Sequence, residues 1–173
     1  MTRPPTDAEF SEMVRASWPS LYRTAYLLLG DAAEAEDLVQ SALTKTYASW
    51  SKVRCVDAGP GYARTVMLNT ATSWFRRRSW RNERPTEVLP EAATCSDEAL
   101  RPTLLDALSR LAPRQRAVVV LRFYEDMSVA ETAAALAVHE GTVKSQTSQA
   151  LRRLRALLAD DVVTVASTGG PHD

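Results

Sequence analysis

Apolar residues recur at helical spacing along most of the chain, and strand-like alternation is weak. A capping-box pattern at Thr6–Glu9 predicts the start of a first helix. We expect Ser17-Trp18-Pro19 to interrupt it, because proline is well accommodated only in the first turn of a helix. A second helix is then predicted to end at Gly30, a residue type that favours helix termination.

Another capping-box pattern, Asp31–Glu34, predicts the start of a long helix whose apolar face continues to Trp50. Residues 51–59 are predicted to form a loop, and Pro60 can begin the next helix, which runs into the basic segment RRRSWR. From about residue 82 onward, prolines, threonines and acidic residues replace the apolar periodicity, which predicts a linker.

The sequence therefore predicts an all-α chain of two small helical domains, residues 6–84 and 102–158. A flexible linker, residues 85–101, joins them, and residues 159–173 are expected to form a frayed tail.

The second domain has the pattern of a helix-turn-helix. Leucines at 104, 105, 108 and 111 form one apolar stripe, and Pro113 begins a helix with apolar positions at 118, 119, 121 and 123. A third capping box, Ser128–Glu131, leads a short helix, Val129–Leu136, which a break separates from a longer helix, Glu140–Leu158. This layout is typical of proteins that bind DNA in the major groove.

The longer helix divides into two faces. The apolar face, predicted to pack in the core, consists of Val143, Ala150, Leu151, Leu154 and Leu158. The other face carries short polar and basic residues that suit base edges and phosphates. A solvated basic face on a core helix is the open alternative, since any exposed helix shows this periodicity. Glu140 argues against a phosphate at the helix start, because it would repel one.

The first domain carries two contrasting surfaces. Acidic residues gather at the start of its long helix, whereas Trp74, Phe75 and Trp80 alternate with arginines in the basic helix. Aromatic rings stack on unpaired bases and guanidinium groups bind phosphates, so this pattern favours single-stranded nucleic acid. The alternative is that Trp74 and Phe75 belong to the core and the arginines only keep the domain soluble.

Charge and cysteine content narrow the class of protein. The formal net charge is zero, which by itself favours no class of partner. The two cysteines, Cys55 and Cys95, stand apart from any CxxC or Cys/His cluster, so we expect neither a zinc site nor a disulfide framework. The polar N-terminus and the short apolar runs predict a cytoplasmic chain without a membrane span.

Four segments, in order and spacing, resemble those of the extracytoplasmic-function (group 4) sigma factors. Ala35–Tyr47 is similar to the polymerase-binding helix of sigma region 2, and Tyr62–Ala71 looks like the helix that follows it. Leu111–Val118 and Gly141–Ser145 resemble region 4. The segments RRRSWR and KSQTSQALRRLR look most like an actinobacterial, sigma-E-like branch of the family.

This resemblance implies an alternative sigma factor that binds core RNA polymerase and directs promoter-specific initiation, without enzymatic activity and without a cofactor. The polymerase partners would be the clamp helices of the largest subunit and the flap of the second-largest subunit, and an anti-sigma factor is a further possible partner. The implied polymerase contacts are Asp37, Leu38, Gln40 and Leu43.

The resemblance also implies two DNA contacts. In the first domain, the loop 51–61 would hold a flipped base of the −10 element, and the implied −10 contacts are Arg54, Asn69, Ser73, Arg76, Arg77, Arg78, Trp80 and Arg81. In the second domain, the implied −35 contacts are Thr142, Lys144, Ser145, Ser148, Gln149, Arg152 and Arg153. Many members carry an arginine where Gln146 stands and another basic residue near Gln149, so we expect this chain to depart from the usual −35 preference.

Three other classes are alternatives. A stand-alone helix-turn-helix regulator would explain the second domain but not the pairing of the AEDLVQ helix with an aromatic-basic helix. An enzyme would need a nucleophile elbow, a metal-ligand spacing or a phosphate loop, and the sequence has none of these motifs. A helical interaction protein that binds no DNA is the third.

Overall fold

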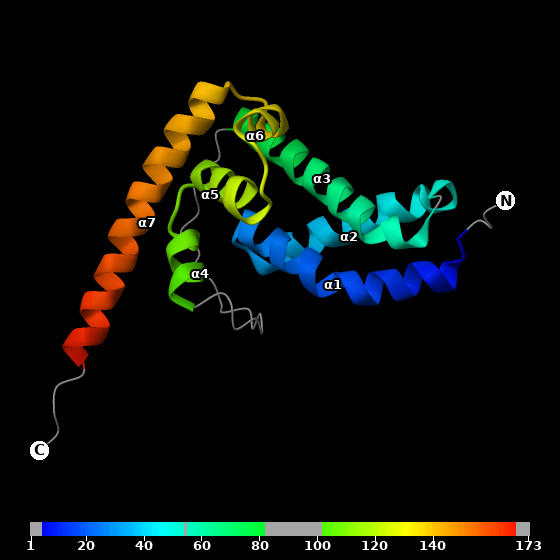
Figure 1. The fold of residues 1–173 in the computed structure, drawn as a ribbon, viewed down its shortest axis with the longest axis horizontal. Coiled ribbons are helices and arrows are strands. Elements are labelled where there is room, and N and C mark those ends of the chain that lie inside the picture. Colours follow the sequence, from blue (N-terminus) through cyan, green and yellow to red (C-terminus); the bar gives the residue numbers. More distant parts are fainter. Residues whose placement is uncertain (1–4, 54, 82–101, 169–173) are drawn as a thin grey trace, which may run out of the picture. The chain divides into compact units, whose positions relative to one another are not determined.

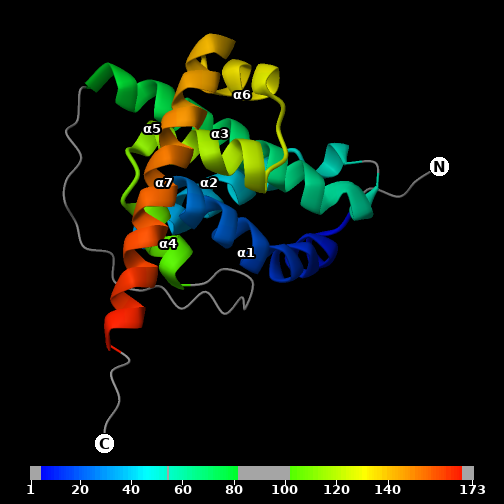
Figure 2. The same cartoon turned by 60° about the vertical axis from the view of Figure 1, so that its left-hand side comes forward.

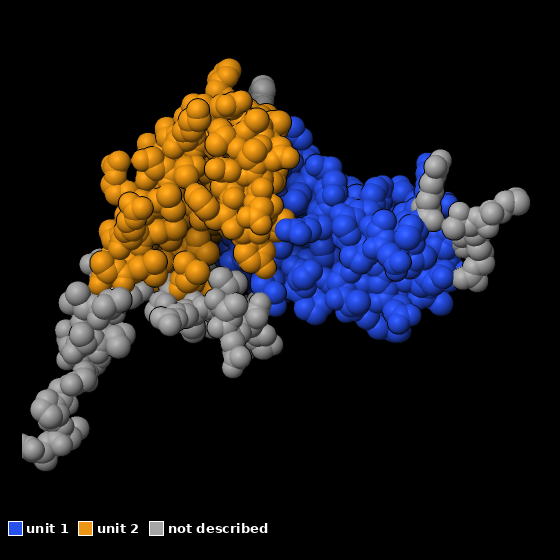
Figure 3. Space-filling model, viewed as in Figure 1, with its two compact units in different colours: residues 1–84 blue, residues 85–173 orange. Residues whose placement is uncertain are grey.

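The computed structural model describes residues 5–53, 55–81 and 102–168, which contain helices and no strand. The chain divides into two compact units, residues 1–84 (unit 1) and 85–173 (unit 2), and the predicted all-α class is confirmed (Figures 1 and 3). The predicted linker, 85–101, lies outside the described residues. The main helices are α1 (Asp7–Leu29), α2 (Ala32–Ala48), α3 (Gly59–Arg81), α4 (Pro102–Ser109), α5 (Pro113–Val119), α6 (Val129–Leu136) and α7 (Glu140–Thr168).

Helix α1 is continuous through Pro19, so the predicted interruption at Ser17-Trp18-Pro19 is wrong. A proline inside a helix costs about 3 kcal/mol, through one lost hydrogen bond and a steric clash. Met13, Ser17 and Leu21 are nevertheless buried along one face on both sides of it. Because α1 packs on both α2 and α3, the burial of this face offsets the cost of the proline.

Unit 1 is a three-helix core in which α2 packs on both α1 and α3. The largest fully buried side chains include Leu28, Leu38 and Met67, one from each helix. The turn between α1 and α2 follows the predicted termination signals. Gly30 adopts a left-handed conformation with φ 72°, and the Asp31 carboxylate accepts the backbone N–H of Glu34 at 2.9 Å.

Trp50 anchors the segment between α2 and α3 on the start of α1. This segment contains two short 3-10 helices, Trp50–Lys52 and Val56–Ala58. The Trp50 indole is 3% exposed, donates its N–H to the Thr6 carbonyl at 3.0 Å and meets the Phe10 ring edge-on at 5.1 Å. A Cβ added to Gly59 would lie 3.0 Å from the same indole, so the ring packs directly on the start of α3.

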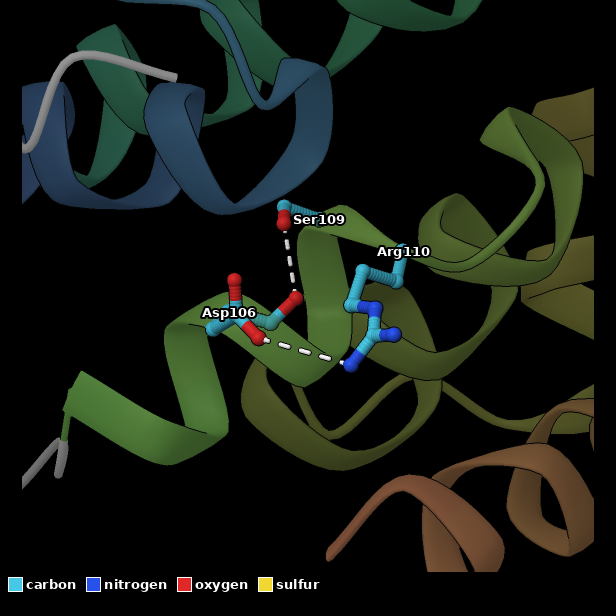
Figure 4. A network of polar contacts seen from close by, with 3 residues as sticks. All are labelled: Asp106, Ser109 and Arg110. Carbon is cyan, nitrogen blue, oxygen red and sulfur yellow. Dashed lines mark hydrogen bonds and ion pairs between the residues drawn. The ribbon is translucent and has the colours of Figure 1, made fainter. Parts of the chain in front are cut away.

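Unit 2 is built on α7, against which α4, α5 and α6 pack (Figure 2). The exposed end of α4 carries a small polar network, in which Ser109 Oγ donates to the Asp106 carbonyl at 2.7 Å and Arg110 lies 3.8 Å from the Asp106 carboxylate (Figure 4). An exposed ion pair of this kind contributes little stability, so the end of α4 is fastened mainly by the buried Leu108 and Leu111.

Helix α5 begins at Pro113 as predicted, but a π-helical turn, Val120–Tyr124, follows it. The extra residue in a π turn rotates the side chains that follow it. Val118 and Leu121 stay in the core, whereas Phe123 is 53% exposed. The prediction that Phe123 shares the apolar face is therefore wrong.

The helix-turn-helix agrees closely with the sequence pattern. Ser128 and Glu131 form both hydrogen bonds of the predicted capping box at the start of α6. The turn has Ala137 in the left-handed region, with φ 53°, and the His139 carbonyl accepts the backbone N–H groups of Thr142 and Val143. The chain has no glycine or proline between Gly141 and Gly169, and α7 continues to Thr168, past the end expected at Leu158.

Candidate nucleic-acid interface

The polar face of α7 is fully available for a partner. Val143 and Ala150 are completely buried and Leu154 is 7% exposed, which anchors the helix on the rest of unit 2. The residues predicted to contact the −35 element are all exposed on the remaining surface: Thr142, Lys144, Ser145, Ser148, Gln149, Arg152 and Arg153. At 1.5 Å per residue this surface is about 16 Å long, and a single helix of this kind fits the major groove of B-DNA.

A small apolar cluster sets the position of α7 relative to α6. Val143 packs with Val118 and Ala133, and the partly buried Val138 of the turn lies against them. The Val138 backbone N–H donates to the Ala133 carbonyl at 3.0 Å. The left-handed Ala137 costs about 1 kcal/mol relative to glycine, and the buried contacts that follow it offset this cost. The turn is thus held by packing on both sides.

The electrostatics at the start of the two helices differ. At α6, the hydrogen bonds from the Ser128 backbone and side chain hold the pKa of Glu131 below its usual value of 4.5. The charged carboxylate also suits the positive end of the helix dipole. At α7 the first residue is the exposed Glu140, which occupies the position where a phosphate would otherwise be favoured. Any phosphate bound by α7 would therefore be expected further along the helix, beside its exposed basic residues.

The predicted polymerase contacts on α2 separate into two groups. Asp37 and Gln40 are exposed, and the Gln40 amide donates to the Glu36 carboxylate at 3.1 Å. Leu38 is completely buried and Leu43 is 7% exposed, because both face the core of unit 1. These two leucines cannot form the surface of a binding site, and they hold α2 in place instead.

The predicted −10 contacts on α3 are brought together only in part. Asn69, Arg76 and Arg77 are exposed and Ser73 is half-buried, with Arg77 donating to the Ser73 carbonyl and hydroxyl, both at 3.4 Å. Trp74 and Phe75 are half-buried. They therefore fit neither alternative fully, being neither exposed rings free to stack on bases nor fully buried core residues. Arg54 and the side chains of Arg78, Trp80 and Arg81 lie outside the described residues.

Sequence reasoning overlooked Lys45. Its ammonium group donates to the hydroxyl of Thr70 at 3.0 Å and so connects α2 to α3 beside Asn69. The helical phase of α2 was the available signal, because Lys45 borders the buried Ala42 and Thr46 on the side of α3.

Three further observations concern the described part of the chain. Cys55 is exposed and free, whereas Cys95 lies outside the described residues. No group of three or more His, Cys, Asp or Glu side chains in the residues described is arranged to hold a metal ion. Within the same residues, no helix combines the length and the apolar composition needed to cross a membrane.

Comparisons with known proteins match both units. The family model for sigma-70 region 2 matches residues 13–81, and that for sigma-70 region 4 matches residues 102–154. The RNA polymerase sigma-E factor of Streptomyces coelicolor is 46% identical over 158 residues, which cover 89% of each chain. The ECF RNA polymerase sigma factor SigL of Mycobacterium tuberculosis is 32% identical over 156 residues, 83% of this chain and 85% of that protein.

A solved structure shares the fold. It is the sigma factor RpoE in complex with the anti-sigma factor NepR from Bartonella quintana, with a TM-score of 0.57 and 26% sequence identity. The match covers 87% of this chain and 96% of that one.

Proposed function

The chain belongs to the extracytoplasmic-function group of sigma-70 factors, and we propose that it works through separate exposed surfaces for polymerase and for promoter DNA. It is an alternative sigma factor, which binds core RNA polymerase and directs it to promoters. The stand-alone regulator is not favoured, because the region 2 match over residues 13–81 has no place in such a protein.

The observation that carries the proposal for DNA is the exposed polar face of α7. Ser145, Ser148 and Gln149 are short or amide side chains that can exchange hydrogen bonds with base edges in the major groove of the −35 element. Lys144 and Arg152 are exposed cations that fix the helix on the phosphates. Gln146 is half-buried, so less of its side chain is accessible to −35 DNA than of the exposed Gln149.

On α2, the exposed Asp37 and Gln40 form the polar centre of the polymerase-binding surface in our proposal. A carboxylate gives strong, charge-assisted hydrogen bonds to a basic partner group, so Asp37 carries most of the effect. The partner is the clamp-helix region of the largest polymerase subunit, and unit 2 meets the flap of the second-largest subunit.

On α3, the exposed Asn69, Arg76 and Arg77 line the path of the unpaired −10 strand, with loop 51–61 holding one flipped base. Both DNA sites are weak alone, and connecting them in one polymerase-bound chain raises their effective concentration. The protein acts by capturing melted DNA, and it catalyses no reaction and uses no cofactor. It works in the cytoplasm. An anti-sigma factor is a proposed partner, since the RpoE relative was solved with one.

The test is run-off transcription on a pool of genomic fragments, with actinobacterial core polymerase in the presence and absence of the purified chain. Specific transcripts are expected only when both are present. Asp37→Ala is expected to weaken holoenzyme assembly, whereas Lys144→Ala is expected to leave assembly intact and weaken promoter binding. Tight duplex binding by the chain alone, without stimulated transcription, would contradict the proposal and favour a stand-alone regulator.

A further inference from the structure

We propose that Lys45 on α2, held in position by the buried Thr70 of α3, forms with Ser73 and Arg77 of α3 a binding site for phosphates of the melted −10 strand. This inference rests on the proposed function of α3 in binding single-stranded promoter DNA, and it extends that surface across the boundary between two helices. Lys45 lies in the segment that resembles the polymerase-binding helix, but the resemblance implied no individual role for it.

The contact between Lys45 and Thr70 holds the ammonium group at a defined position. The Thr70 hydroxyl donates to the Val66 carbonyl at 2.8 Å, so its oxygen is oriented to accept the Lys45 N–H at 3.0 Å. Thr70 is 3% exposed, whereas Lys45 is exposed. Two of the three ammonium donors have no partner among the described residues and remain for a ligand.

Arg77 lies further along the same flank of α3. Thr70, Ser73 and Arg77 are spaced by three and four residues, which places them on one side of a helix. The Arg77 guanidinium is exposed and donates to the Ser73 carbonyl and hydroxyl. Thr70 and Arg77 are about 10 Å apart along the helix axis, so two cations lie along the path of one strand.

The charge pattern leaves these cations free for an anion. The sequence from Leu38 to Val56 contains no aspartate or glutamate, and neither does α3 from Gly59 to Arg81. Lys45 therefore has no acidic neighbour on its own turn of α2 or on the facing turns of α3. Fixed cations on an uncompensated positive surface favour the phosphodiester groups of DNA.

A role confined to stability is the simpler alternative, since a lysine in the last turn of α2 also suits the helix dipole. The hydrogen bond to Thr70 argues against a role at the helix dipole alone, because the ammonium group turns to a side chain of α3 and not to the final carbonyls of its own helix, but a contact between α2 and α3 could still serve stability. The two explanations differ in the salt dependence of DNA binding, which a purely structural lysine would leave unchanged.

The experiment measures binding of reconstituted holoenzyme to a fluorescent forked promoter whose −10 non-template strand is unpaired, between 50 and 200 mM salt. Each phosphate contact on a single strand adds about 0.7 to the slope of log affinity against log salt. Lys45→Ala is expected to reduce the slope by about 0.7. The ratio of wild-type to variant affinity for the forked DNA should therefore fall about threefold between 50 and 200 mM salt. Lys45→Arg is expected to restore most of the slope, and Arg15→Ala, an exposed cation on α1, is the matched control.

An unchanged slope in Lys45→Ala, with a reduced slope in Arg76→Ala, would overturn this inference and leave the proposed function of α3 intact. Unchanged slopes in both variants would contradict the proposed function itself. A loss of affinity for core polymerase in Lys45→Ala, with normal binding to the forked DNA by assembled holoenzyme, would also overturn the inference, because Lys45 would then belong to the polymerase surface.

Discussion

Leu38 and Asp37 are neighbours in a segment expected to contact polymerase, and the structure predicts opposite outcomes for their substitution. Leu38 is completely buried between the helices of unit 1, whereas Asp37 is exposed. Leu38→Ala is therefore expected to act on the stability of unit 1, and Asp37→Ala on the affinity for polymerase.

The size of the stability effect follows from the buried side chain. Truncation of leucine to alanine removes three carbon atoms from the core, each worth about 0.8 kcal/mol in transfer free energy. The cavity that remains adds to this, so Leu38→Ala should lower the free energy of unfolding by about 3 kcal/mol. With a urea dependence of about 1.5 kcal/mol per M, the unfolding midpoint should fall by about 2 M.

The distribution of tryptophan allows this measurement in the whole chain. All four tryptophans, at positions 18, 50, 74 and 80, lie in unit 1, so intrinsic fluorescence follows the unfolding of this unit without interference from unit 2. The exposed Asp37→Ala variant is the control and is expected to shift the free energy by less than about 0.5 kcal/mol.

Polymerase binding completes the comparison. Since a domain of ordinary stability still has a folded majority after losing about 3 kcal/mol, Leu38→Ala should bind core polymerase nearly as well as wild type in buffer. An unchanged urea midpoint in Leu38→Ala, combined with a loss of polymerase affinity as large as that of Asp37→Ala, would refute the packing of α2 described here.

Four further outcomes are expected. Ser128→Ala removes the cap of α6 and should lower the stability of unit 2 by about 1 kcal/mol, measured by the loss of helical circular dichroism with heating. Because the pKa of Glu131 is lowered in the folded state, its contribution to the free energy of unfolding is complete above pH 4.5 and is lost as the pH falls through the folded pKa. Glu131→Gln should therefore make the free energy of unfolding fall less steeply with acid, in denaturation curves recorded between pH 3 and 6. Gly59→Ala should destabilise unit 1 by about 1 kcal/mol in the fluorescence assay, because its Cβ would press on the buried Trp50 ring. Lys144→Ala should reduce the salt slope for a −35 duplex by about 0.9, and a slope equal to that of wild type would remove Lys144 from the phosphate contacts.

Features determined by neighbours in sequence were predictable in this chain. The caps at Thr6 and Ser128 and the terminator at Gly30 require only residues within a turn, and the structure confirms all three. The exposed face of α7 was predictable for the same reason, since the helical repeat fixes which residues oppose the buried Val143 and Ala150.

Features determined by packing over longer distances were not predictable. Pro19 is tolerated because of contacts that α1 makes with two other helices, and a local rule takes no account of them. Phe123 is exposed because a π turn shifts the phase of its helix, and the sequence periodicity contains no sign of that turn. The burial of Leu38 and Leu43 depends on which face of α2 packs against the other helices of unit 1. The resemblance covered the segment Ala35–Tyr47 as a whole, so it did not separate the core residues of this helix from its surface residues.

The contact of Trp50 with Gly59 has a consequence for how related sequences should vary. Gly59 has φ −54° and ψ −48°, an ordinary helical conformation that any residue can adopt, so the backbone does not require glycine there. The restriction comes from neighbouring side chains, chiefly the Trp50 ring, 3.0 Å from where a Cβ would lie, with the Met13 Cγ at 3.3 Å. Positions 50 and 59 should therefore covary among homologues, with alanine or a larger residue at 59 wherever a smaller side chain replaces the tryptophan, and such pairs would gain the helix propensity that glycine lacks, about 1 kcal/mol.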